Sequence, residues 1–277
     1  MTDVTGRHFL VTGANTGIGK ETARGLAKAG GKVTLAGRSE EKTRAAIDDI
    51  RATVPDADLA FVQLDLADLD SVRGAAAEFL ARDEPLDVLI NNAGLAGSPG
   101  MTASGFEMTF GTNYVGPFLF TQLLLDRLKQ ADAARIVNVA STMHYQAKGI
   151  DWDAVRKPTT SRIGMKEYSV SKLANVVHAQ ELARRLAGTN VTTYSLHPGV
   201  IASDVYRKVP WPARKVMTMF MKSTEDGAKT SLYCATSPDV AGDTGLYYDN
   251  SAQKPPSSVA TPELAAELWS RTEDWLR

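Results

Sequence analysis

The sequence predicts an α/β protein in which helices cover both faces of a doubly wound parallel sheet. Short apolar segments of strand length alternate with segments that have the 3.6-residue period of helices. Strands separated by helix-length segments form βαβ units, and such units build buried parallel sheets. Neither a fixed-period repeat nor a Gly/Ser/Pro-rich linker divides the 277 residues, so we expect a single domain spanning 1–277.

Seven strands can be placed from runs of apolar and β-branched residues. They are His8–Thr12, Lys32–Ala36, Leu59–Leu64, Val88–Asn91, Arg135–Ala140, Thr192–Leu196 and Gly245–Tyr248. The segments with helical period are Ile18–Ala29, Glu40–Thr53, Leu69–Arg82, Gly105–Gln130 and Glu167–Leu186. Two stretches break this alternation, the polar segment His144–Lys166 and the Trp/Met-rich segment Ser203–Lys222.

Composition and charge exclude several classes of protein. The formal net charge is -1, with charged residues of both signs interspersed, so no nucleic-acid partner is indicated. No run of residues approaches the roughly 20 apolar positions that a membrane span requires, and Met1–Gly13 leads into a strand without room for a signal peptide or anchor. The single cysteine, Cys234, excludes an intramolecular disulfide. We therefore expect a soluble, cytoplasmic protein without a membrane anchor.

A glycine cluster follows the first predicted strand. The segment TGANTGIGK places Gly13, Gly17 and Gly19 between that strand and the next helix. Glycines permit a tight turn and let backbone N–H groups approach a pyrophosphate, whose charge a helix N-terminus stabilises. The spacing G-x-x-x-G-x-G differs from the common G-x-G-x-x-G pattern. Its placement predicts a dinucleotide site, and a turn needed only for packing is the alternative.

The end of the second strand distinguishes NAD from NADP. An acidic residue there would bond the ribose 2′-hydroxyl, whereas an arginine accommodates a 2′-phosphate. The segment Ala36–Ser39 contains no acid, and Arg38 offers a planar, permanently charged group that suits phosphate, with Ser39 as a second donor. Alternatively, Ser39 caps the following helix and Arg38 pairs with Glu41. We predict that NADP(H) is preferred over NAD(H).

Tyr168 and Lys172 lie four residues apart in YSVSK, so a helix projects both side chains from one face. A tyrosine in water titrates near ~10, and moving its pKa towards ~7 requires about 4 kcal/mol of phenolate stabilisation. A cation roughly 4 Å away in a half-wet site supplies about that much. We interpret the pair as a proton donor with its activating cation; an exposed helix face is the alternative for such a pair taken alone.

Ser141 follows the fifth predicted strand, at the rim where doubly wound sheets bind ligands. There its hydroxyl could hydrogen-bond a carbonyl oxygen, although a capping or turn serine is the alternative. His144, three residues later, could line the mouth of a pocket, whereas we expect His197 to be a packed turn residue. None of the four histidines has the spacing of a metal ligand, and the predicted chemistry needs no metal.

The glycine loop, Asn91-Asn92-Ala93-Gly94, Tyr168-xxx-Lys172 and Pro198-Gly199 occur in the order typical of the short-chain dehydrogenase/reductase family, which the chain resembles nearly end to end. The segments NTGIGKETA, YSVSKLANVVHAQELARRL, HPGV and TSLYCA are most similar to its retinol dehydrogenase and WW-domain oxidoreductase branch. This resemblance implies a Rossmann-like fold. The spacing of 27 residues from Ser141 to Tyr168 exceeds that of many short members, and the same branch carries a comparable insertion.

The resemblance also implies specific site residues. The catalytic tetrad falls on Asn113, Ser141, Tyr168 and Lys172. Together with Arg38 and Ser39, the cofactor contacts are Gly13, Asn15, Thr16, Gly17, Ile18, Gly19, Asp65, Leu66, Asn92, Ala93, Gly94, Tyr168, Lys172, Pro198, Gly199, Val200, Ile201 and Ser203. Asn91 matches a residue that braces the central sheet. Asn113, in a helix that Gly116-Pro117 could loosen, could anchor a water that leads protons to Lys172.

These observations predict an NADP(H)-dependent oxidoreductase that interconverts a carbonyl and an alcohol on a lipophilic small molecule. The lipophilic part rests on the resemblance and on the segment 203–222, interpreted as a substrate flap; a buried helix or a subunit contact is the alternative. A catalytically weak NADP(H)-sensing protein on the same fold and a sugar-nucleotide epimerase or dehydratase are the competing functions. The resemblance further implies a homodimer or homotetramer that pairs through Gly105–Gln130 and Glu167–Leu186.

Overall fold

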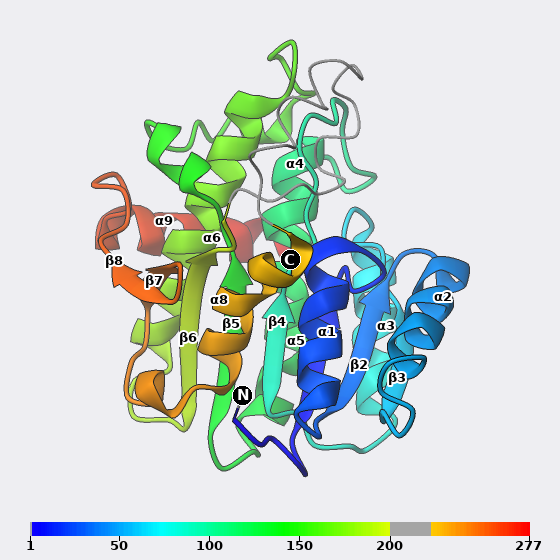
Figure 1. The fold of residues 1–277 in the computed structure, drawn as a ribbon. Helices are drawn as coiled ribbons and strands as arrows, with labels where there is room; N and C mark the ends of the chain where they lie inside the picture. The colour runs from blue at the N-terminus through cyan, green and yellow to red at the C-terminus, as the bar shows by residue number, and fades with distance from the viewer. Residues whose placement is uncertain (1, 200–222) are drawn as a thin grey trace.

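The computed structural model, which describes residues 2–199 and 223–277, contains an eight-stranded sheet with the order β3-β2-β1-β4-β5-β6-β7-β8 (Figure 1). Neighbouring strands from β3 to β7 are parallel, and β8 is antiparallel to β7. The strands are β1 His8–Thr12, β2 Lys32–Gly37, β3 Leu59–Gln63, β4 Val88–Asn91, β5 Ala134–Val139, β6 Val191–His197, β7 Leu246–Asp249 and β8 Ala252–Lys254. The predicted α/β fold with a doubly wound parallel sheet is confirmed.

Helices pack on both faces of this sheet and enclose two apolar layers. One layer includes side chains of α1, α2 and α8, and the other includes side chains of α3, α5, α6 and α9. The helices are α1 Gly17–Lys28, α2 Glu40–Arg51, α3 Leu69–Leu80, α4 Met108–Phe110, α5 Gly116–Leu128, α6 Met165–Arg185, α8 Thr224–Thr236 and α9 Pro262–Leu276. Within the described residues, no helix is both long enough and apolar enough to span a bilayer.

The predicted elements agree with the observed ones to within a few residues, apart from one helix and the C-terminal elements. The helix predicted over Gly105–Gln130 begins at Met108, ends at Leu128 and is interrupted by a π-helical turn, η1. The helices α8 and α9 and the strand β8 were not predicted. The strand β8 has only three residues, all exposed, so it lacks the buried alternation that marks a strand.

The direction of the strand order reverses between β1 and β4. From β1 the chain proceeds outward to β2 and β3, whereas from β4 it proceeds the other way to β5, β6 and β7. Ligands of open α/β sheets bind outside the carboxyl ends of strands where the order reverses in this way. The predicted glycine loop follows β1 and Asn92 follows β4, so both lie at this reversal.

The C-terminal helix α9 packs against α6 and against the start of α5. Trp269, only 4% exposed, packs its ring 4.8 Å from that of Phe118 on α5 and lies beneath the Arg185 guanidinium of α6 at 4.3 Å. Next to it, the hydroxyls of Tyr114 and Thr272 share a buried 2.8 Å hydrogen bond. These contacts hold α9 against α6, which carries Tyr168 and Lys172, and against Tyr114, which follows Asn113 in sequence.

Replacing Trp269 with alanine should lower the free energy of unfolding by about 3–5 kcal/mol, because truncating a buried aromatic side chain leaves a cavity. Urea denaturation monitored by circular dichroism measures the change. Leu123→Ala is the control, since Leu123 is 37% exposed on α5 and should cost under about 1 kcal/mol. Equal effects of the two substitutions would show that α9 is not packed as described.

Candidate active site

The glycine loop leaves the N-terminus of α1 accessible to an anion. Gly13 and Gly17 adopt the left-handed conformation, with φ of +66° and +57°. A Cβ added at Gly13 would lie 2.8 Å from the Cα of Ala93, whereas one at Gly17 would meet no atom of the described residues within 4 Å. The loop is therefore closely packed on its inner side and open beside the helix start. This combination fits a dinucleotide pyrophosphate.

A threonine hydroxyl joins the ends of β1 and β4. Thr12 Oγ1 accepts hydrogen bonds from the backbone N–H groups of Asn92 at 3.1 Å and Ala93 at 3.0 Å. The Asn92 side chain donates in return to the Thr12 carbonyl at 2.8 Å and approaches the Gly13 carbonyl at 3.4 Å. The two predicted cofactor-contacting segments are thus held together. Sequence reasoning did not identify Thr12, although a hydroxyl residue directly before the loop glycine was a usable signal.

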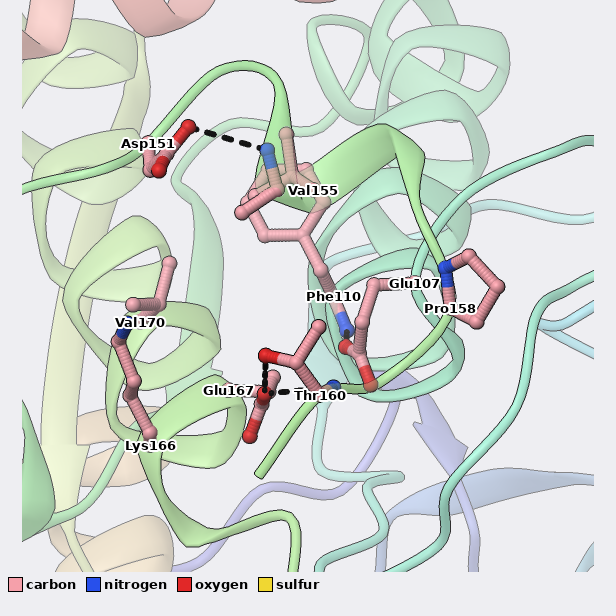
Figure 2. A pocket seen from close by; sticks show the side chains of 10 residues that line it. Glu107, Phe110, Asp151, Val155, Pro158, Thr160, Lys166, Glu167 and Val170 are labelled. Carbon is pink, nitrogen blue, oxygen red and sulfur yellow. Dashed lines mark hydrogen bonds between the residues drawn. The ribbon is translucent and has the colours of Figure 1, made fainter.

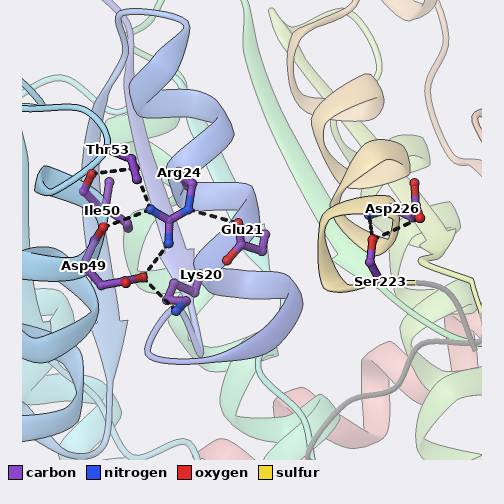
Figure 3. Close-up of polar contacts among 8 residues, drawn as sticks. All are labelled: Lys20, Glu21, Arg24, Asp49, Ile50, Thr53, Ser223 and Asp226. Atoms are coloured by element: carbon purple, nitrogen blue, oxygen red, sulfur yellow. Dashed lines mark hydrogen bonds and ion pairs between the residues drawn. The ribbon is translucent and has the colours of Figure 1, made fainter. Parts of the chain in front are cut away.

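Arg24 and Lys20 connect α1 to α2, as Figure 3 shows. Arg24, 9% exposed, donates to the Asp49 carboxylate at 2.5 Å, to the Thr53 hydroxyl at 2.7 Å and to Glu21 at 3.0 Å. Lys20 donates to the same Asp49 carboxylate at 2.8 Å. These bonds fix the position of α1, which follows the glycine loop, relative to α2, which follows Arg38. A ligand that contacts both segments requires such a fixed arrangement. Figure 3 also shows the Ser223 hydroxyl accepting from the Asp226 N–H at the start of α8.

The end of β2 bears on the choice between NAD and NADP. Ser39 caps α2, accepting a hydrogen bond from the Lys42 N–H at 3.3 Å, so the alternative weighed for this serine does occur. Arg38 is exposed, and among the ion pairs of the described residues none joins it to Glu41. The Arg38 guanidinium thus remains available to solvent or to a phosphate at the strand tip.

Asp65 and Leu66 follow β3 at the same edge of the sheet. The Asp65 carboxylate accepts the Ala67 N–H at 3.0 Å, and the Asp65 N–H lies 2.9 Å from the Ser71 hydroxyl. A Cβ at Gly116 would overlap the carbonyl of Leu66, so this glycine allows α5 to approach the loop closely. The turn after β3 is therefore fixed from both sides.

Asn113 lies in the π-helical turn η1, Gly111–Val115, directly before α5. Pro117 has no N–H to offer the carbonyl of Asn113 four residues earlier, which explains why the α-helical pattern fails here. The Asn113 side chain holds Leu95 with two bonds: its Oδ1 accepts the Leu95 N–H at 2.8 Å, and its Nδ2 donates to the Leu95 carbonyl at 2.9 Å. The loop after β4 is thereby fixed next to α6.

A buried serine connects Asn113 to Tyr168. Ser171, 0% exposed, receives a hydrogen bond from Asn113 Nδ2 at 3.0 Å and donates its own hydrogen to the Tyr168 carbonyl at 2.8 Å. Sequence reasoning missed Ser171, whose position three residues after Tyr168 allows a bond back to that carbonyl. Three members of the predicted tetrad, Asn113, Tyr168 and Lys172, therefore lie around one short stretch of α6.

Lys172 is the buried charge of the site. Its side chain is 3% exposed, its Nζ donates to the carbonyl of Val139 at 2.8 Å, and burial lowers its pKa to about 8. Nζ also lies 5.6 Å from the centroid of the Tyr168 ring. A Cβ added at Gly94 would come within 3.4 Å of this ammonium group and 3.3 Å of Asn113 Oδ1. Gly94 therefore makes room for both side chains.

Ser141 lies two residues beyond the carbonyl that Lys172 contacts. Its Oγ accepts the Met143 N–H at 3.2 Å and caps the 3-10 turn η2, Thr142–Gln146. The capping alternative is thus realised, but a hydroxyl that accepts one bond still has a hydrogen to donate. Asn91, also predicted, donates to Asn138 at 3.0 Å and to Thr121 at 2.9 Å, so it joins β4 to β5 and α5.

Several predicted contacts cannot be placed. Val200, Ile201 and Ser203 and the whole predicted flap 203–222 lie outside the described residues. Pro198 and Gly199, which directly follow β6, are described and half-buried, and Gly199 has a φ of +98°. Of the segment predicted to contact the nicotinamide, the structure therefore describes only Pro198 and Gly199.

The insertion His144–Lys166 is ordered by two carboxylates. Glu107 accepts the Phe110 N–H at 2.8 Å and also bonds the Thr159 hydroxyl, while Glu167 accepts the N–H groups of Thr160 and Ser161 at 3.2 and 2.9 Å. Figure 2 shows both carboxylates in a small, mostly apolar pocket between α4, the insertion and the start of α6. None of the tetrad residues lines this pocket.

Comparison with known proteins decides the family. The sequence model of the family described as short chain dehydrogenase matches residues 7–153. The chain is 42% identical to mouse retinol dehydrogenase 12 over 275 residues, which covers 96% of this chain and 85% of that protein. The chain belongs to the short-chain dehydrogenase family. Human retinol dehydrogenase 13 is 40% identical over 279 residues, covering 97% of this chain and 84% of that protein, so the chain falls in the retinol dehydrogenase branch and is an oxidoreductase.

Solved structures agree with the fold. A Mycobacterium paratuberculosis protein of uncharacterised function superposes with a TM-score of 0.80 at 31% identity, covering 99% of this chain and 95% of that one. A Shigella flexneri short-chain dehydrogenase complexed with NADP superposes with a TM-score of 0.73 at 25% identity, covering 91% of this chain and 100% of that one. A nicotinamide cofactor is therefore implied, in agreement with the open start of α1.

The buried ammonium group of Lys172 predicts an unusual pH dependence of stability. Between pH 8 and 10.5 the folded chain leaves this amine neutral while the unfolded chain protonates it, so its cost to folding falls as pH rises. Without cofactor, the unfolding free energy of the wild type relative to Lys172→Met should increase by about 2 kcal/mol from pH 7.5 to 10.

Urea titrations at the two pH values measure this difference. Lys166→Met serves as the control, because Lys166 is exposed on the same helix. Parallel pH profiles for the wild type and Lys172→Met would contradict the assignment of Lys172 as a buried, titrating amine.

Proposed function

We propose that the protein is an NADP(H)-dependent reductase or dehydrogenase that interconverts a ketone or aldehyde and an alcohol on a lipophilic small molecule. The observation that carries the proposal is the buried Lys172 ammonium beside Tyr168 at the sheet edge that also holds the glycine loop. Family membership supports an enzyme. The presence of all four predicted tetrad residues supports an enzyme over a cofactor-sensing protein, which has no need of them. When bound, the nicotinamide would supply or accept the hydride.

The residues of this chain manage the proton and the oxygen. In the reducing direction Tyr168 would donate a proton to the substrate oxygen, and the Ser141 hydroxyl would donate a hydrogen bond to the same oxygen as charge develops on it. The Lys172 ammonium would favour the phenolate that Tyr168 leaves behind. The Asn113 carbonyl, which Pro117 cannot bond, would hold a water that returns protons to Lys172. Oxidation reverses each step.

A lipophilic substrate is supported by composition and by the relatives. Segment 203–222, which follows the nicotinamide-side turn in sequence, is rich in large apolar side chains: Trp211, Met217, Met219, Phe220 and Met221. The relative mouse retinol dehydrogenase 12 is named for retinol, which is an apolar alcohol. We therefore propose long-chain aldehydes and ketones as the substrate class, with retinal as one member of a test panel.

Assembly and location stay predictions. A homodimer or homotetramer that pairs through Gly105–Gln130 and Glu167–Leu186 is typical of the family. α9 packs on α6 and on Phe118 at the start of α5, and Leu123 of α5 stays exposed. Action in the cytoplasm remains an expectation from the sequence.

Replacing Tyr168 with phenylalanine should lower kcat by about 10²–10⁴ because the proton donor is lost. The dissociation constant for NADPH should stay within about threefold, since the phenol hydroxyl contributes little to holding the nucleotide. NADPH oxidation with decanal and with retinal, and NADPH fluorescence titration, measure the two quantities. Tyr145→Phe, which removes an exposed hydroxyl, is the matched control. A kcat within tenfold of wild type would show that Tyr168 is not the acid.

Replacing Arg38 with aspartate should shift the ratio of kcat/KM for NADPH to that for NADH by about 100-fold towards NADH, because a charge-assisted phosphate contact becomes a repulsion. Arg51→Asp makes the same change of charge at the far end of α2 and should leave the ratio unaltered. Steady-state kinetics with both cofactors decide the matter. An unchanged preference in Arg38→Asp would reject Arg38 as the phosphate-binding residue.

A further inference from the structure

His144 lies fully inside the protein beside the segment that carries Ser141. Its side chain is 0% exposed and belongs to η2, the turn that Ser141 caps. Its ring packs 3.9 Å from that of Tyr145 and 4.7 Å from that of Tyr247, measured between centroids. The possibility raised from the sequence, that His144 lines a pocket mouth, is therefore not realised, and its ring nitrogens bond inside the fold.

Both ring nitrogens of His144 bond the backbone. Nδ1 lies 2.7 Å from the carbonyl oxygen of Ser141, and Nε2 accepts the N–H of Ser257 at 3.1 Å. A carbonyl oxygen only accepts, so Nδ1 must carry the hydrogen and Nε2 must lack one. This defines the neutral Nδ1–H tautomer, and burial lowers the pKa of His144, which favours the neutral ring.

We propose that His144 is a positioning residue that holds the backbone of Ser141 so that the serine hydroxyl meets the substrate oxygen. The Ser141 carbonyl accepts both the His144 backbone N–H at 3.0 Å and the imidazole hydrogen. The Ser141 Oγ accepts the Met143 N–H at 3.2 Å. Three bonds thus fix the residue at its carbonyl and its side chain. The inference rests on the proposed role of Ser141 in the reaction.

The Nε2 bond extends this positioning to the C-terminal segment. Ser257, 7% exposed, lies between β8 and α9, 113 residues from His144 in the sequence. The neighbouring Tyr145 hydroxyl donates to the Pro255 carbonyl at 2.6 Å. The segment that leads into α9 is therefore fastened to the turn after Ser141.

Three variants separate the two bonds of the ring. In His144→Asn the amide nitrogen occupies the place of Nδ1 and can still donate to the Ser141 carbonyl, whereas His144→Gln can replace only the Nε2 acceptor. His144→Leu fills the space and makes neither bond. With decanal and NADPH, we expect kcat within about threefold of wild type for His144→Asn and about tenfold lower for His144→Gln and His144→Leu. The KM for NADPH should change by less than about twofold in all three.

The control is Tyr145→Phe, which removes the adjacent hydrogen bond to Pro255 but leaves both bonds of the His144 ring in place. It should keep kcat within about twofold. Thermal unfolding of each variant shows that the assays use folded protein. A purely structural role predicts that kcat follows thermal stability rather than the retained Nδ1 donor. Equal losses in His144→Asn and His144→Gln would therefore overturn the inference.

A double-mutant cycle with Ser141→Ala tests the mechanism of coupling. Once the hydroxyl is gone, His144→Leu should lower kcat by less than about twofold, because nothing remains to be positioned. A full tenfold loss in that background would overturn the inference. If Ser141→Ala alone keeps wild-type kcat, the proposed role of the serine fails together with the inference. If Ser141→Ala loses activity while His144→Leu does not, only the inference fails.

Discussion

The proposed active site depends on one buried cation, the ammonium group of Lys172. Burial lowers the pKa of Lys172 from 10.5 to about 8, which corresponds to disfavouring the charged form by about 3 kcal/mol. The hydrogen bond to the Val139 carbonyl offsets part of the cost of burying the charge. A lysine is kept in such a place only if neighbouring groups tolerate it. Gly94 leaves room for the ammonium group, and the Tyr168 ring lies beside it. The geometry at the carboxyl edge of the sheet follows from accommodating this charge.

Backbone irregularities next to Lys172 do much of the positioning. Pro117 disrupts the α-helical pattern before α5, and the resulting π-helical turn directs Asn113 towards Leu95 and Ser171. The Ser171 hydroxyl in turn donates a hydrogen bond to the Tyr168 carbonyl. α9 packs on α6, which carries Tyr168 and Lys172, and on Phe118 of α5, so α6 is held by contacts with both the sheet and the C-terminal helix.

The sequence predicted those features that depend on local signals. The alternation of strands and helices, the glycine loop after β1 and the Tyr168-xxx-Lys172 pair are encoded by neighbouring residues and were recognised. Asn113 was identified only through the family resemblance, because an asparagine in a helix carries no local signal of function. The role of His144 could not be predicted, since its partner Ser257 lies 113 residues away and the pairing is decided by tertiary packing. The same holds for α9.

The most direct test of the account is the fate of the hydride. NADPH carrying deuterium at C4 of the nicotinamide, on the face that reacts, is incubated with decanal, and the alcohol product is examined by mass spectrometry. The account predicts one deuterium per product molecule, bound to the carbinol carbon, because the carbonyl carbon receives the hydride directly. Product without deuterium at that carbon would contradict direct transfer from the cofactor.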